Sequence, residues 1–197
     1  MMTSNKGRMS FWKPGQPVTL DTPRCIIRTM TAEDVTDRYI GWFADPQIMH
    51  NITMAMGLDR AELLNFVASF NNRERFHFGV FLKDTGLHIG WLKLLCDMEN
   101  RKGVMTTVVG DPAYWRRGFG FEMRSALIGF MFDVLDLHKA ISMVYSDNPK
   151  THALNTKLGL QLEGILRKDE IGPGGTWRDV HVFGILADEW RQRSGPA

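Results

Sequence analysis

The 197-residue chain has little cysteine, little net charge and no long apolar run. Cys25 and Cys96 lie far apart and have no CxxC or Cys/His companion, which argues against a disulfide framework and a zinc site. The formal net charge of +2 gives no field that calls for nucleic acid or an anionic membrane as a partner. No run approaches the roughly 20 apolar residues of a membrane-spanning helix. These absences predict a soluble, cytoplasmic protein that holds no metal.

The composition is that of one ordinary domain, because 44% of the residues are hydrophobic and can bury a substantial core. Residues 1–22 are broken by charges and prolines and offer no signal-peptide core. We therefore expect an N-terminal lead over residues 1–22, one domain over residues 23–190 and a C-terminal tail over residues 191–197.

Apolar patterning and capping signals predict a mixed α/β (α+β) fold. Thr31 and Asp34 predict a helix start that runs to about Asp45–Pro46, and Asp59 with Glu62 has the pattern of a capping box. Further helices are expected from the glycines at 118 and 120 and over residues 149–158. Short apolar runs predict strands over residues 24–30, 76–82, 87–96, 103–109, 139–145, 161–171 and 177–186, the last two joined by a glycine-rich turn. The prediction is a mostly antiparallel sheet of about seven strands with about four flanking helices.

A turn rich in arginine and glycine joins strand 103–109 to the longest predicted helix and reads Trp115-Arg116-Arg117-Gly118-Phe119-Gly120. The free N–H groups of a helix start favour phosphate, glycines let the backbone approach it, and arginines neutralise its charge. The same spacing also suits a plain glycine-rich loop with solvated arginines. The chain has no GxxxxGK[ST], and Met123 replaces the third glycine of GxGxxG, which weakens the nucleotide alternatives.

The turn resembles the acetyl-CoA motif [RQ]xxGx[GA] of the GNAT superfamily of N-acetyltransferases, with Trp115 in the first position. Its Pro-Ala-Tyr lead-in and Glu122 resemble the branch of the ribosomal-protein alanine N-acetyltransferases. Further likenesses follow in the same order over roughly residues 24–187, at residues 42–46, 84–91, 148–160 and 164–167. The resemblance implies a GNAT-like domain whose sheet contains a splayed parallel pair of strands.

Acetyl-CoA is the co-substrate that the resemblance implies. The pantetheine arm would pair with strand backbone, and the diphosphate would lie on the turn. Asn148 resembles a cofactor-binding residue of the family and is also an ordinary helix cap. The residues expected to bind the co-substrate are Val108, Val109, Gly110, Trp115, Arg116, Arg117, Gly118, Phe119, Gly120 and Asn148.

The acid and base of the reaction are less well marked. Many relatives have a tyrosine seven residues after the asparagine that protonates the departing thiolate, and Asn155 stands there in this chain. Asn155 and Tyr145 are the catalytic candidates, although a strand tyrosine more often serves packing. As bases, Asp97, Glu99, Asp111 and His77 lie near predicted sheet ends, and spacing selects none of them.

The amine side of the site is expected between the first helices and the last hairpin, with Trp42, Asp45, His50 and Trp177 as lining. The predicted reaction is direct attack of a primary amine on acetyl-CoA through a tetrahedral intermediate, by a monomer or homodimer. The amine could belong to a protein N-terminus, an amino acid, an aminosugar or another small amine. The alternatives are a catalytically silent acyl-CoA-binding regulatory module and a protein that binds another diphosphate at the same turn.

Overall fold

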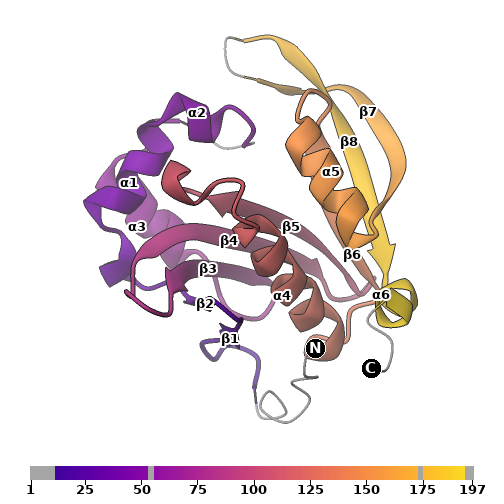
Figure 1. Ribbon diagram of the computed structural model, residues 1–197, viewed down its shortest axis with the longest axis horizontal. Helices are drawn as coiled ribbons and strands as arrows, with labels where there is room; N and C mark the ends of the chain where they lie inside the picture. Colours follow the sequence, from indigo (N-terminus) through magenta and orange to yellow (C-terminus); the bar gives the residue numbers. More distant parts are fainter. Residues whose placement is uncertain (1–11, 53–55, 173–174, 194–197) are drawn as a thin grey trace.

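Eight strands form one sheet in the order β1-β2-β3-β4-β5-β6-β8-β7 in the computed structural model, which describes residues 12–52, 56–172 and 175–193 (Figure 1). The strands are β1 (Thr19–Asp21), β2 (Cys25–Thr29), β3 (Arg75–Leu82), β4 (His88–Asp97), β5 (Lys102–Val109), β6 (Lys139–Tyr145), β7 (Gln161–Ile171) and β8 (Trp177–Leu186). The helices are α1 (Asp37–Ala44), α2 (Pro46–Met49), α3 (Arg60–Ala68), α4 (Phe119–Asp133), α5 (Pro149–Leu158) and α6 (Ala187–Arg193). Short 3₁₀ turns cover Ala32–Asp34 and Pro112–Tyr114.

The strands β5 and β6 form the parallel pair, and all other neighbouring strands pair antiparallel. Their pairing begins at Lys102 with Lys139 and ends at Val104 with Ile141. Both strands continue beyond that point, to Val109 and Tyr145, so their facing edges diverge. The predicted splayed pair is confirmed, and in Figure 1 the sheet opens between these two strands.

Two hydrophobic cores lie on opposite faces of the sheet, because successive side chains of a strand point to opposite faces. Leu92 of β4 belongs to the larger core, which includes the buried face of α4. Its neighbour Trp91 belongs to the second core, which includes α1 and α3. The sheet is therefore covered on both faces, and the gap between β5 and β6 lies inside the sheet and not at an edge.

Helix boundaries follow the predicted caps with one exception. Asp59 and Glu62 form the expected capping box of α3, and α1 ends at Ala44, just before Asp45 and Pro46. Thr31 caps a helix with Asp34 in its first turn, as predicted, but this helix is a 3₁₀ turn over Ala32–Asp34 and does not continue into α1. Asp34 accepts hydrogen bonds from the Thr31 amide and from Arg28. The Thr36 hydroxyl caps α1 instead, accepting from the Tyr39 amide.

The sheet has one strand more than the sequence predicts. The strand β1 lies inside the expected lead segment and pairs with β2 over only three residues, which is too short for a periodic signal. The expected tail contributes to α6, which runs to Arg193. Parts of the expected lead, turn and tail, residues 1–11, 173–174 and 194–197, lie outside the described residues. None of the helices within the described ranges is both long and apolar enough to cross a membrane.

Candidate active site

The turn that opens α4 has the backbone conformation expected of an anion site. Gly118 is the N-cap of α4 with φ 82°, and Arg116 also has a positive φ, 59°. In the described part of the chain no side chain caps this helix. The first amides of α4 are thus left for a ligand, and left-handed residues beside a helix start form concave sites for anions.

An arginine that the sequence did not single out holds this turn in place. Arg24 donates through Nη1 to the Arg117 carbonyl oxygen over 2.9 Å, and its guanidinium stacks on the Phe119 ring. Its Nε pairs with Glu122 Oε2 at 2.7 Å, and Thr22 donates to Oε1 of the same carboxylate. Burial raises the pKa of Glu122, but the hydrogen bonds from Thr22 and Arg24 outweigh this effect and lower it. Glu122 therefore anchors the turn between β1 and β2 to α4.

The glycines of the turn leave room that the protein itself does not use. A Cβ at Gly120 would find Leu154 Cδ2 as its nearest neighbour at 3.6 Å, an ordinary contact distance. A Cβ at Gly118 would find only Arg24 Nη2, also at 3.6 Å. The packing of the protein therefore does not require a bare backbone at Gly120.

Two tryptophans fix the end of β5 next to this turn. The Trp115 indole Nε1 donates to the Val109 carbonyl oxygen over 2.7 Å, and the Gly110 amide donates to Ile89 O over 2.9 Å. The Trp42 ring packs so closely on Gly110 that a Cβ there would lie 2.3 Å from it. Because successive amides of a strand point to opposite edges, the Val109 N–H faces away from β4, toward the gap.

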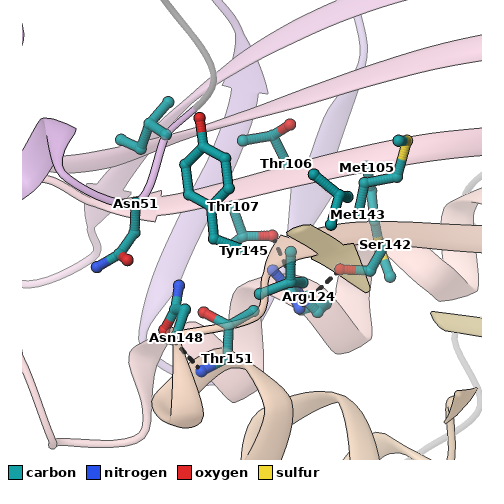
Figure 2. Close-up of a pocket in the computed structure, with 13 residues that line it drawn as sticks. Asn51, Met105, Thr106, Thr107, Arg124, Ser142, Met143, Tyr145, Asn148 and Thr151 are labelled. Carbon is teal, nitrogen blue, oxygen red and sulfur yellow. Dashed lines mark hydrogen bonds between the residues drawn. The ribbon is translucent and has the colours of Figure 1, made fainter. Parts of the chain in front are cut away.

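A cavity of about 60 Å³ lies between the diverging strands (Figure 2). Its walls come from β5, β6, the start of α5, the segment after α2, and one side chain each from α4 and β8. The lining residues are Asn51, Ile52, Met105, Thr106, Thr107, Arg124, Ser142, Met143, Val144, Tyr145, Asn148, Thr151 and Val180. Both faces of the sheet thus contribute to one opening.

Arg124 projects from α4 into this region and is only 3% exposed. Its Nε donates to Thr107 Oγ1 over 3.2 Å, and its Nη1 donates to Ser142 Oγ over 3.4 Å and to Asn155 Oδ1. Burial lowers the pKa of Arg124 to about 10, which leaves the guanidinium protonated at neutral pH. The sequence pattern predicted an amphipathic helix here but gave no indication that Arg124 is buried.

The two asparagines of the sequence motif lie at different depths. Asn148 lines the cavity and caps α5, its Oδ1 accepting from the Thr151 amide over 3.2 Å. Asn155 is fully buried behind the cavity, where its amide contacts Arg124 and Ser142. An amide group does not titrate in the physiological range, so Asn155 contributes hydrogen bonds and not a proton.

Tyr145 lines the cavity under an arginine. The Arg178 guanidinium stacks on its ring at 3.8 Å, pairs with Asp147 and donates through Nη1 to the His50 carbonyl oxygen over 2.8 Å. Burial, and then the charge of Glu170, raise the pKa of Tyr145 to about 12, so its hydroxyl remains a proton donor at neutral pH. Arg178 thereby connects β8 to the end of α2 across the gap.

The four residues expected to line the amine side do not gather around this cavity. Trp42 is buried against Gly110, Asp45 caps α2 by accepting from the Gln47 amide, and Trp177 is 59% exposed on β8. His50 contributes its carbonyl oxygen to Arg178. Among the residues that line the cavity, Asn51 and Ile52 come from the expected amine side, in the segment that follows α2.

His77, one of the candidate bases, is buried away from the cavity. Its Nε2 lies 2.8 Å from the Tyr39 hydroxyl, and burial lowers the pKa of His77 to about 3. Both carboxylate oxygens of Asp111 already have partners, because Asp111 pairs with Arg38 at 2.7 Å and accepts a hydrogen bond from the Ala113 amide. The geometry therefore gives neither residue the open position that a base for the amine needs.

A mixed sheet with a splayed parallel pair, and a glycine turn that opens the helix beside it, define an acetyltransferase class of fold. Residues 24–161 match the family model described as acetyltransferase (GNAT) domain, so the chain belongs to the GNAT family.

Curated relatives agree with this assignment. The uncharacterized N-acetyltransferase YoaA of Bacillus subtilis is 27% identical over 177 residues, covering 85% of this chain and 96% of the relative. The prophage-derived uncharacterized N-acetyltransferase YokL of the same organism is 30% identical over 149 residues, covering 70% and 82%. The chain is thus an acetyltransferase, and the silent module is not favoured.

Solved structures share the fold. The spermidine N-acetyltransferase of Vibrio cholerae, in complex with CoA and spermine, superposes with a TM-score of 0.77 at 20% identity, covering 84% of this chain and 97% of that one. A GNAT-family acetyltransferase of Bacillus anthracis gives a TM-score of 0.76 at 20% identity, covering 87% and 99%.

Proposed function

We propose that this chain transfers an acetyl group from acetyl-CoA to a primary amine. The observation that carries the proposal is the uncapped start of α4 at Gly118, beside the gap between β5 and β6. The start of α4 offers amides for the diphosphate, and the gap offers unpaired strand edges for the extended pantetheine arm. The Vibrio cholerae relative, described with CoA and spermine, supports this choice of donor.

The residues that would hold the donor divide into two groups. The amides of Phe119 and Gly120, with Arg116 and Arg117, would bind the diphosphate. The Val109 backbone, which faces the gap, would pair with the pantetheine arm, whereas the Val108 backbone faces β4. Gly110 and Trp115 would support this backbone, because both are hydrogen-bonded at the end of β5. Asn148 would contribute from the opposite wall of the cavity.

Bound acetyl-CoA supplies the acyl group as a thioester, and the chain supplies orientation and charge stabilisation. The Val109 N–H, which faces the gap, would polarise the thioester carbonyl, where negative charge develops during acyl transfer. The amine must lose a proton to react, and water that enters the cavity would accept it. Tyr145 would donate a hydrogen bond from the cavity wall, since it remains protonated.

The acceptor is a primary amine of a protein N-terminus, an amino acid, an aminosugar or another small molecule. The lead-in of Pro112 to Trp115 resembles the branch of the ribosomal-protein alanine acetyltransferases, which supports including a protein N-terminus. The transferase unit spans residues 23–190 in this proposal.

Incubation with acetyl-CoA and a panel of these amines, while free thiol is measured, tests the function. The proposal predicts thiol release that depends on one class of amine and forms a stoichiometric amount of acetylated product. Tight CoA binding without amine-dependent thiol release across the whole panel would instead support an acyl-CoA-binding module.

A further inference from the structure

Arg124 is a buried cation without a buried anion. Its three hydrogen bonds go to neutral groups, Thr107 of β5, Ser142 of β6 and Asn155 of α5. No carboxylate of the described residues forms an ion pair with it, and burial alone accounts for its lowered pKa. Taking an isolated charge out of water costs free energy unless a partner compensates it. The position therefore suits an anion that arrives with a ligand or forms during the reaction.

The location of Arg124 restricts what that anion can be. The guanidinium lines the cavity between the diverging edges of β5 and β6, one helical turn beyond Gly120 on α4 (Figure 2). The exposed cations Arg116 and Arg117 are available for the phosphates outside the sheet. Within the proposed donor, the group that becomes an anion inside the gap is the thioester, which becomes a thiolate.

Its neighbour Asn155 stands where the sequence resemblance expects a tyrosine that protonates this thiolate. A tyrosine ring at 155 would occupy the space of the groups that now contact both sides of the Asn155 amide, namely Arg124 Nη1 and Ser142 Oγ. The chain thus has a fixed positive charge beside the position where relatives have a proton donor.

We propose that the Arg124 guanidinium stabilises the leaving thiolate of CoA directly, as an electrostatic substitute for an acid at residue 155. This inference rests on the proposed function. In the transfer, the amine nitrogen bonds to the carbonyl carbon and the carbon–sulfur bond breaks with its electron pair on sulfur. The surplus proton of the amine leaves to water, and the thiolate remains paired with Arg124.

Binding of CoA and of desulfo-CoA, which lacks the thiol, tests this without turnover. A guanidinium favours the thiolate, so the thiol of bound CoA should ionise below the pKa of an unperturbed thiol, which is about 8.5 for cysteine. The wild-type preference for CoA over desulfo-CoA should therefore rise between about pH 6 and pH 8.5. In Arg124→Gln this rise should disappear, whereas Arg124→Lys, which keeps the charge, should retain it in part.

Kinetics provide a second readout. Arg124→Gln should lower kcat with acetyl-CoA about 100-fold, the usual effect of losing one group that stabilises charge in the transition state. The double variant Arg124→Leu/Asn155→Tyr, which exchanges the charge for an acid, should recover activity relative to Arg124→Leu. Thermal unfolding of each variant shows whether it is folded at the assay temperature.

The outcomes separate the two proposals. If the wild type binds CoA and desulfo-CoA equally at every pH, or if Arg124→Gln keeps the pH-dependent preference, Arg124 does not face the sulfur while the proposed function stands. If the wild type binds neither ligand, the proposed function itself fails, and this inference fails with it.

Discussion

The Trp42 ring lies directly against the backbone of Gly110, in the place that a side chain at residue 110 would fill. This contact joins α1 to the end of β5 and so to the edge on which the donor would bind. The contact with Trp42 thus explains why residue 110 is a glycine, although the sequence resemblance suggested Gly110 as a residue that binds the co-substrate.

Gly110→Ala should destabilise the protein, because the new methyl group would lie 2.3 Å from the Trp42 ring. Overpacking of this kind costs about 1–3 kcal/mol in the free energy of unfolding. Gly41→Ala, in α1 beside Trp42, is the matched control. A Cβ at Gly41 meets no atom within 4 Å, so this change should be neutral or stabilising. Urea unfolding of both variants measures the difference, and equal stability would exclude the tight packing.

Glu122 should make the stability of the protein sensitive to acid. Its pKa is lowered in the folded state, so its contribution is fully present above the pKa of the unfolded chain, about 4.3, and is lost as the pH falls through the lower folded value. Glu122→Gln should therefore lose less stability than the wild type between pH 5 and pH 3, a range around that pKa. Denaturant unfolding at several pH values tests this, and parallel pH profiles of the two proteins would contradict it.

Arg116 and Arg117 should contribute to CoA binding mainly through charge. The double alanine variant should weaken binding about tenfold at low salt, which corresponds to about 1.4 kcal/mol. The loss should shrink as salt is added, because salt screens exposed charges. Arg191→Ala, which removes an exposed arginine of α6 that pairs with Asp188, is the control and should bind as the wild type does. Identical salt dependence in the wild type and the double variant would mean that both arginines point to solvent.

Arg178 should affect the binding of the amine rather than the binding of CoA. It stacks on Tyr145 and holds the His50 carbonyl across the gap, so Arg178→Met should loosen the amine side of the cavity. The expected result is a raised KM for the amine with a nearly unchanged Kd for CoA. A matched loss of CoA affinity would place Arg178 on the donor side instead.

The sequence predicted most of the fold because its signals are local. The caps at Asp59 and Gly118 and the strands after residue 138 lie where the pattern placed them, since each depends on residues close in sequence. The first predicted helix was too long, because the turn capped by Thr31 ends at Asp34, which also pairs with Arg28 of β2. The short strand β1 had no periodicity to detect.

The candidate site was less predictable because its key contacts are distant in sequence. Arg24 reaches Arg117 across 93 positions, and Arg124 reaches Asn155 across 31. A lone arginine in an amphipathic helix carries no mark that distinguishes a solvated side chain from a buried one. Only the packing of α4 against the gap shows that Arg124 is buried, and that no carboxylate of the described residues pairs with it.

The start of α4 is the proposed binding site for the diphosphate of CoA, and calorimetric titration of two glycine variants and the wild type with CoA tests this. Gly120 and Gly129 both lie in α4, and a Cβ at either meets no atom closer than 3.6 Å. Gly120→Leu and Gly129→Leu should therefore both fold, since leucine favours a helix more than glycine does. We predict that Gly120→Leu abolishes CoA binding while Gly129→Leu binds as the wild type does. Equal CoA affinity in all three proteins would contradict the account.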